Sequence, residues 1–153
     1  MSQNPKVDYL KGNFYEKIGK SELAVEKFRE AAESGYERAQ LILGQLYDSQ
    51  GEIEKAENWY RSAFNNGVDY AAFNLGNMYY NNEIYDTSLY WYEKAAQAGD
   101  VFAMEDLAHL YEKGEGVIRS EEKALYWINK SCENGYEKAC EVLKKYREVQ
   151  KEN

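Results

Sequence analysis

A pattern of glycines and tyrosines repeats every 32 residues along most of this chain. Four glycines share one position of the pattern, with steps of 32, 32 and 36 residues: Gly35, Gly67, Gly99 and Gly135. Four tyrosines keep the 32-residue step without interruption: Tyr15, Tyr47, Tyr79 and Tyr111. A period of this length is typical of stacked supersecondary units, each of which buries its apolar surface against its neighbours. The repeat therefore predicts a stacked array, which offers an extended surface more readily than an enclosed catalytic pocket.

Each unit divides into two amphipathic helices joined by a short turn. In the third unit, Ala71, Leu75 and Met78 recur at the spacing of one helix face, and Leu89 and Tyr92 do so in its second half. Short polar or glycine-bearing stretches between these helices make them antiparallel neighbours. We expect a single all-α repeat domain over residues 1–153, with helix pairs at about 4–36, 37–68, 69–100 and 101–136 and a terminal helix at 137–150.

Small and large residues alternate in register, which predicts close helix crossings. Gly44 and Gly76 occupy one position of the repeat, and Ala108 stands there in the fourth unit. Large residues fill two further positions, which hold Trp59, Trp91 and Trp127, then Phe28, Tyr60, Tyr92 and Ile128. A bulky side chain at the small positions would overpack the crossing by roughly 1–3 kcal/mol. The aromatics could instead bind a cofactor, but their strict register favours core packing, and we expect no cofactor.

The charge balance narrows the class of partner. The 27 acidic and 19 basic residues give a formal net charge of −8. Nucleic acid and anionic membrane surfaces require clustered Lys and Arg, so both are disfavoured as partners. The charge would steer a basic partner towards this surface, or it serves only solubility. No apolar run is long enough for a transmembrane helix, and the first residues lack the pattern of a secretion signal. We therefore expect a cytoplasmic protein, with a secreted or periplasmic location only if a leader was removed.

The repeated residues resemble the Sel-one-like repeat (SLR) family, a branch of the tetratricopeptide-like helical repeats. That family's unit is similar to A-x-x-x-L-G-x-x-Y, then G-x-G-V, then K-A-x-x-W-Y/F-x-x-A-A-x-x-G. The third unit matches it with Ala71, Leu75, Gly76, Tyr79, Trp91, Tyr92, Ala95, Ala96 and Gly99. The fourth unit carries the longer loop, Gly114, Gly116 and Val117. Departures are Ala108 for Gly, Ser88 for Ala, Ser131-Cys132 for Ala-Ala, and Lys27 at the first tryptophan position.

The resemblance implies a right-handed superhelix, or solenoid, of helix pairs whose first helices line a concave groove. It also implies a non-enzymatic protein–protein interaction scaffold that binds a peptide or protein segment in that groove. Mapped onto this chain, the variable positions of the first helices give these candidate binding residues: Arg38, Leu41, Gln45, Asp48, Tyr70, Phe73, Asn77, Tyr80, Phe102, Glu105, His109 and Glu112.

One row of these positions suggests contacts with a peptide backbone. Asn13, Gln45, Asn77 and His109 stand 32 residues apart and would form a polar ladder. The neighbouring aromatic residues suit apolar or cationic side chains, and Glu105 and Glu112 favour a basic ligand. The alternative is that the ladder is merely solvated or satisfies neighbouring helices.

Catalytic and metal sites find little support in the sequence. His109 is the single histidine, and although Glu105 and Glu112 share its helix face, no nucleophile or second metal ligand of suitable spacing accompanies it. Cys132 and Cys140 flank the turn at Asn134-Gly135. Their spacing resembles the disulfide motif of secreted cysteine-rich members of the family, but a cytosolic location favours reduced thiols.

Two other classes of function compete with the scaffold. A small acidic inhibitor or immunity-type protein would neutralise a basic toxin or enzyme through a tight, salt-sensitive contact. A hydrolase, as implied by a few cysteine-rich relatives that resemble penicillin-binding enzymes in activity, would need a reactive Ser or Cys beside a base. The sequence offers no such pair, so we expect no enzyme activity; it does not predict the oligomeric state.

Overall fold

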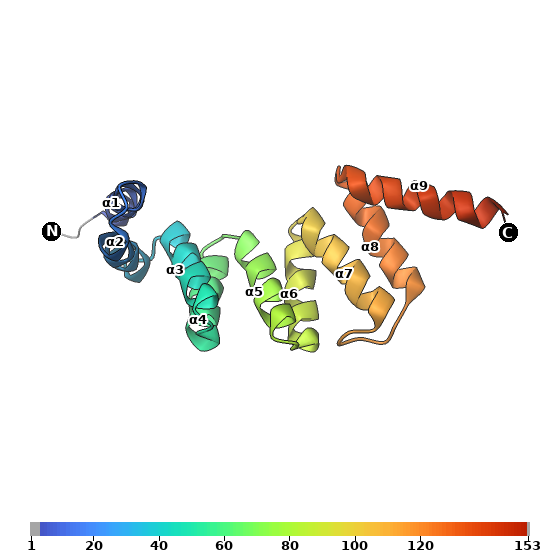
Figure 1. Cartoon of the computed structure of the whole chain (residues 1–153), viewed down its shortest axis with the longest axis horizontal. Helices are drawn as coiled ribbons and strands as arrows, with labels where there is room; N and C mark the ends of the chain where they lie inside the picture. The colour runs from blue at the N-terminus through green and yellow to red at the C-terminus, as the bar shows by residue number, and fades with distance from the viewer. Residues whose placement is uncertain (1–3, 153) are drawn as a thin grey trace. The chain divides into compact units, whose positions relative to one another are not determined.

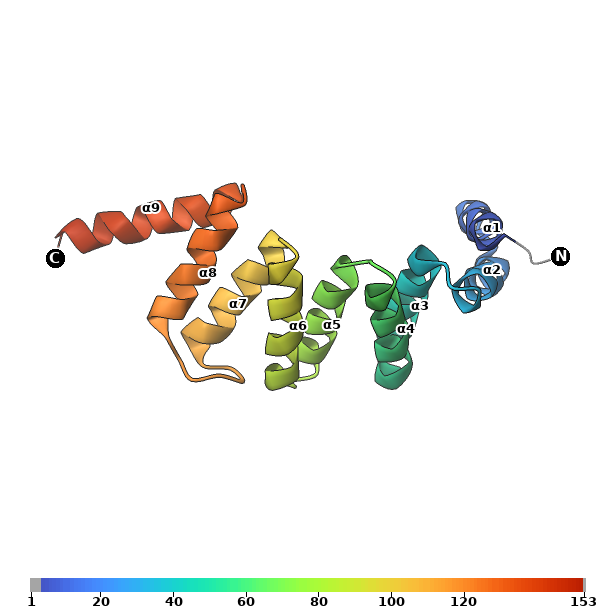
Figure 2. The same cartoon turned by 180° about the vertical axis from the view of Figure 1, so that it is seen from behind.

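The computed structural model describes residues 4–152, and these residues form nine α-helices and no strand (Figures 1 and 2). This confirms the predicted all-α class. The helices are α1 (Pro5–Lys17), α2 (Ser21–Glu33), α3 (Glu37–Ser49), α4 (Ile53–Asn65), α5 (Tyr70–Asn81), α6 (Tyr85–Gln97), α7 (Val101–Lys113), α8 (Glu121–Glu133) and α9 (Glu137–Glu152). No helix of the described residues has the length and apolar character needed to cross a bilayer.

Successive helices form hairpins, and the chain folds into two compact units. The first unit ends at Asn74 and the second begins at Leu75, so the boundary falls within α5. In the first unit α1 packs on α2, α2 on α3 and α3 on α4. In the second unit α6 packs on α7, α7 on α8 and α8 on α9. The first helix begins after Asn4, whose side chain accepts a hydrogen bond from the backbone N–H of Lys6 at 3.0 Å.

One hydrophobic core cluster of the first unit is built from apolar residues of α2 and α3, with partly buried side chains around them. Its buried residues are Ala24, Phe28, Ala31, Ala32, Ala39 and Leu43. A buried amide adds polar contacts: Gln40 Nε2 donates to the Ala32 carbonyl at 3.2 Å, and its Oε1 accepts from Asn66 Nδ2 at 2.8 Å. Because both groups of this amide are satisfied, its burial carries little penalty.

Three helix crossings place an aromatic ring directly against a glycine. A Cβ added at Gly12 would lie 2.5 Å from Phe28 Cε1, one added at Gly44 would lie 2.6 Å from Tyr60 Cε1, and one added at Gly76 would lie 2.5 Å from Tyr92 Cε1. The predicted requirement for small residues at Gly44 and Gly76 is therefore confirmed. The three rings are buried, with exposures of 2–3%.

Two buried serines of the second unit replace the alanines of the repeat pattern. Ser88 and Ser131 are fully buried. The Ser88 hydroxyl donates to the Gly76 carbonyl at 2.8 Å, and the Ser131 hydroxyl donates to the Val101 carbonyl at 3.0 Å. Each hydroxyl thus tethers the second helix of a hairpin to the backbone of the first, at no cost of an unpaired polar group.

The tryptophan prediction holds for one of three residues. Trp91 is 4% exposed, whereas Trp59 and Trp127 are only half-buried. Ile128, predicted to be a core residue, is also half-buried. The repeat pattern gives the three tryptophans equivalent positions, but α4 and α8 are less completely covered at this position than α6.

The turns within the hairpins use left-handed backbone. Gly19, Gly51 and Glu83 are equivalent positions with φ of 74°, 73° and 60°. In the third of these turns the left-handed residue is Glu83, which has a side chain where the first two turns have glycine. The longer loop between α7 and α8 contains Gly116, where an added Cβ would lie 2.5 Å from the carbonyl carbon of Tyr85. This loop therefore packs on the start of α6, and only glycine fits there.

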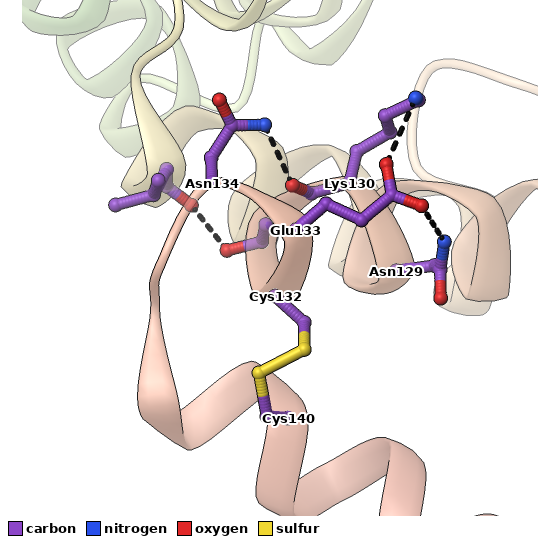
Figure 3. The surroundings of a disulfide bond; sticks show 8 residues. Asn129, Lys130, Cys132, Glu133, Asn134 and Cys140 are labelled. Atoms are coloured by element: carbon purple, nitrogen blue, oxygen red, sulfur yellow. Dashed lines mark hydrogen bonds and ion pairs between the residues drawn. A yellow bond between two sulfur atoms is a disulfide. The ribbon is translucent and has the colours of Figure 1, made fainter.

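A disulfide joins Cys132, in the last turn of α8, to Cys140, in the first turns of α9 (Figure 3). The two Cα atoms are 4.8 Å apart. Beside it the Glu133 carboxylate accepts from Asn129 Nδ2 at 2.6 Å and Lys130 Nζ at 3.0 Å. The expectation of reduced thiols is wrong for this structure. It rested on an inferred compartment, whereas the tight turn at Gly135, with φ of 93°, brings the two cysteines together.

Candidate functional site

The second unit contains a pocket of about 480 Å³ formed by α7, α8 and α9, called here the α7–α9 pocket. Its lining consists of Glu105, Ala108, His109, Glu112, Arg119, Glu121, Ala124, Leu125, Ile128, Val142 and Tyr146. Four residues of α7 line the pocket: Glu105, His109 and Glu112, which the sequence predicted as binding residues, and their neighbour Ala108. They lie together because they recur every three or four residues along one helix face. The loop before α8 supplies Arg119, and α9 supplies Val142 and Tyr146.

The lining of the α7–α9 pocket combines apolar and charged side chains. The apolar residues are Ala108, Ala124, Leu125, Ile128 and Val142. Three carboxylates, of Glu105, Glu112 and Glu121, and one guanidinium, of Arg119, leave the lining with a net formal charge of two negative units when His109 is neutral. The Tyr146 hydroxyl donates to Glu121 Oε1 at 3.1 Å, which raises the pKa of Tyr146 and holds the Glu121 carboxylate in place.

A substitution in the repeat pattern accounts for the α7–α9 pocket. In the three preceding hairpins the position of Ile128 holds a buried phenylalanine or tyrosine that lies against glycine. The fourth hairpin has Ala108 in place of that glycine and Ile128 in place of the ring. Because an isoleucine side chain is shorter than a tyrosine ring, space is left over, and both residues line the pocket.

A second hollow of about 310 Å³ adjoins the first and is called here the Asp106 hollow. It is lined by Tyr80, Tyr92, Glu105, Asp106 and His109. Burial, together with the carboxylates of Glu105 and Asp100, raises the pKa of Asp106 to about 6. Glu105 and His109 line both hollows, and the two hollows together are called here the acidic recess.

The structure brings four of the predicted residues of the second unit together in the acidic recess: Tyr80, Glu105, His109 and Glu112. Asn77 lies next to it and accepts a hydrogen bond from the Tyr92 hydroxyl at 2.7 Å. One acceptor of the predicted polar ladder is therefore used within its own hairpin. Phe102 lies elsewhere, where its half-exposed ring packs edge-on against Tyr136 with centroids 5.3 Å apart.

The first unit has a separate hollow of about 570 Å³, to which the predicted residues Arg38, Leu41 and Tyr70 contribute. Phe73 packs on Tyr70, with ring centroids 5.6 Å apart. Gln45 is exposed outside this hollow. Asp48 also lies outside it and accepts a hydrogen bond from the Tyr60 hydroxyl at 3.4 Å; burial raises the pKa of this carboxyl.

Sequence reasoning missed several residues of these hollows. Asp106 stands two residues before the small-residue position of the repeat, where Asn74 stands in the preceding unit, so its polar character in the pattern was the available signal. Arg119 and Glu121 belong to the longer loop and the start of α8, and Tyr146 belongs to α9. The sequence offered no signal for these three, because their approach depends on how the loop and α9 pack.

A metal site finds no support among the described residues. Among residues 4–152, no group of three or more His, Cys, Asp or Glu side chains is arranged so that it could hold a metal ion. The arrangement of the acidic recess, open and lined by carboxylates, aromatic rings and aliphatic side chains, is suited to non-covalent binding.

Comparisons with known families identify the repeat. Residues 69–100 and 101–136 each match the Sel1 repeat, and residues 9–67 match a tetratricopeptide repeat. The fold and the recess together define a helical-repeat protein of the tetratricopeptide type. Within that type, residues 69–136 carry Sel1 repeats, and proteins with Sel1 and tetratricopeptide repeats generally act as protein–protein interaction scaffolds and are typically non-enzymatic.

Solved structures agree with this assignment. The protective antigen c5321 of uropathogenic Escherichia coli strains displays an SLR fold. It is 29% identical to this chain over 89% of this chain's length, with a TM-score of 0.74. A Sel1 repeat protein from Oxalobacter formigenes is 26% identical over 88% of this chain, with a TM-score of 0.73. The matched regions make up 32% and 60% of those two chains, so this chain spans only part of their lengths.

A more distant structure shares the fold alone. The Helicobacter pylori cysteine rich protein B is 20% identical over 77% of this chain and 96% of its own, with a TM-score of 0.56. A comparison with curated protein sequences found no match.

Proposed function

We propose that this chain is a non-enzymatic adaptor that binds an exposed segment of a partner protein in the acidic recess. The observation that carries the proposal is the sharing of Glu105 and His109 by the α7–α9 pocket and the Asp106 hollow. Two adjoining hollows of this kind can receive neighbouring side chains of one extended segment, whereas a single small ligand would need only one.

The lining favours a partner segment with basic and apolar residues. Glu105, Glu112 and Glu121 supply negative charge, and the whole chain carries a formal net charge of −8. Such a field accelerates encounter with a basic segment and makes the association rate fall as salt is added. Tyr80 and the apolar residues of the α7–α9 pocket offer the area that would contribute most of the affinity.

Selection from a library of random dodecapeptides displayed on phage tests the proposal. Selected peptides are synthesised with a fluorescent label, and their affinity for the whole chain is measured by fluorescence anisotropy at two salt concentrations. We expect Tyr80→Ala and Glu105→Gln to weaken binding about tenfold, because each removes a lining group of the recess. Matched controls are Tyr90→Ala and Glu93→Gln on α6, neither of which lines the recess.

Two outcomes would overturn this proposal. One is selection of peptides whose affinity is unchanged by both recess variants while all variants unfold at the wild-type temperature. The other is failure of the library to yield any binder of the whole chain.

The disulfide bears on where the binding takes place. Disulfides persist mainly in oxidising compartments, and thiols stay reduced in the cytosol. The bond between Cys132 and Cys140 therefore favours an oxidising compartment, while the cytoplasmic location expected from the sequence stays a prediction. Alkylation of unreduced protein in intact cells, followed by mass measurement, distinguishes the two: two added alkyl groups would support the cytoplasm.

A further inference from the structure

We propose that the α7–α9 pocket is a specificity pocket for one lysine or arginine side chain of the partner segment. This inference rests on the proposed function for its biological setting, but it concerns a single pocket and one chemical class of side chain. It commits to an occupant with an aliphatic stem and a cationic end.

The apolar part of the pocket matches an aliphatic stem. Leu125 and Ile128 of α8 and Val142 of α9 line it from two helices, and Ala108 lines it from a third. An aliphatic chain placed against these groups would remove apolar surface from water on both sides of the contact. The methylene stems of lysine and arginine bind to protein surfaces in this way while their charged ends stay at the polar edge.

The carboxylates of the pocket match a cationic end. Glu105 and Glu112 come from α7 and Glu121 comes from the first turn of α8, so the negative charges lie on two elements. The Tyr146 hydroxyl at 3.1 Å fixes Glu121, which lowers the entropy lost when a cation binds to it. Arg119 offsets one of the three negative charges, and the remaining excess disfavours an acidic side chain.

The pocket also depends on a side chain that distinguishes the fourth hairpin from the third, Ile128. In the third hairpin the buried Tyr92 ring occupies the position of Ile128 and lies against Gly76. The partner side chain would therefore take up part of the space that an internal aromatic ring fills in the preceding hairpin. This relationship supplies a variant that closes the pocket with a side-chain pair already compatible with the fold, Ala108→Gly combined with Ile128→Tyr.

Nuclear magnetic resonance titration with single amino-acid probes tests the inference directly on the whole chain. The probes are N-acetyl-lysine amide and N-acetyl-arginine amide, with N-acetyl-norleucine amide as a control that keeps the stem of lysine and lacks its charge. We expect the charged probes to shift the methyl resonances of Ile128, Leu125 and Val142 with millimolar affinity, and norleucine amide to bind at least about fivefold more weakly.

Variants locate the probe and separate charge from shape. The double substitution Glu105→Gln and Glu121→Gln should weaken the charged probes about fivefold. Glu122→Gln is the control in the same helix turn; Glu122 does not line the pocket, so this variant should leave affinity unchanged. The pocket-closing pair Ala108→Gly and Ile128→Tyr should abolish the methyl shifts while the protein stays folded by circular dichroism.

Three results would overturn the inference: equal binding of norleucine amide, no methyl shift with any probe, or full binding by the folded pocket-closed variant. These are distinguishable from failure of the proposed function. Peptides that bind in the recess without a lysine or arginine would refute the specificity pocket and retain the proposed function. Binding of the charged probes without any selected peptide would do the reverse.

Discussion

The third and fourth hairpins meet the same packing requirement with different pairs of side chains. In the third, the Tyr92 ring is 2% exposed, lies against Gly76 and donates its hydroxyl to Asn77 at 2.7 Å. In the fourth, Ala108 and Ile128 stand at the equivalent positions, and both line the α7–α9 pocket. The first pair fills the space between its helices and the second leaves part of it open, so the fold has gained a recess by giving up internal packing.

The largest test of this contrast compares two tryptophans at equivalent positions. Trp91 of α6 is 4% exposed, whereas Trp127 of α8 is half-buried. We expect Trp91→Ala to lower the free energy of unfolding by about 3–5 kcal/mol and Trp127→Ala by less than half of that, because the second creates a smaller cavity. Urea unfolding followed by circular dichroism measures both. Equal losses would mean that the fourth hairpin is as tightly packed as the third.

A second test targets the glycine and the ring of the third hairpin. Gly76→Ala should cost about 1–3 kcal/mol, because the new Cβ would lie 2.5 Å from Tyr92 Cε1. Combining it with Tyr92→Ile recreates the pair of the fourth hairpin. We expect the double variant to lose about 1 kcal/mol less unfolding free energy than the two single variants lose in total. The double-mutant cycle uses the same unfolding measurement. Strictly additive losses would show that the ring and the glycine are not coupled.

The repeat pattern was sufficient to predict the helices, the close crossings and part of the recess. Gly44 and Gly76 could be recognised because the fold requires the same small residue in every unit, and a requirement of that kind appears as periodicity. Tyr80, Glu105 and His109 could be placed on one surface because each stands on the same face of the first helix of its repeat unit. Features that recur in every unit can therefore be predicted from the sequence.

Features that differ between the units could not be established from the repeat pattern, for a physical reason. The α7–α9 pocket depends on the size difference between Ile128 and a tyrosine, and on the approach of Val142 and Tyr146 from α9. The disulfide depends on a 4.8 Å separation of two Cα atoms across a turn; the spacing of the cysteines resembles a disulfide motif, but the inferred compartment decided the prediction against the bond. Such contacts are decided by the packing of non-equivalent elements, about which a repeat pattern carries no information.

A third test concerns a partly buried carboxyl group, that of Asp106, which distinguishes the fourth hairpin. Burial raises the pKa of Asp106 from 3.8 to about 6, while Asn74 stands at the equivalent position of α5. Because the folded state holds the proton more tightly than the unfolded state, stability falls as the pH rises from 3.8 to about 6 and stays reduced above it. Asp106→Asn removes this penalty.

The variant should gain about 1 kcal/mol of unfolding free energy at neutral pH, a figure that already allows for partial solvent screening of the carboxylate, and nothing near the lower end of that pH range. Thermal unfolding of wild type and variant across this range provides the measurement. A stability difference that does not change with pH would show that Asp106 titrates normally in the folded protein.

The smallest expected effect comes from the turns that begin the second helix of each hairpin. Glu83 has a left-handed φ of 60° in the third hairpin, whereas the longer loop of the fourth begins with Gly114 at φ 77°. Left-handed backbone strains a residue with a Cβ, but glycine loses more backbone entropy on folding, so the two effects partly cancel. We expect Glu83→Gly to stabilise the protein by about 0.5 kcal/mol and Gly114→Ala to destabilise it by about 1 kcal/mol. Calorimetric melting temperatures of the two variants check this, and destabilisation by Glu83→Gly would show that the Glu83 side chain contributes more to the third hairpin than its backbone strain costs.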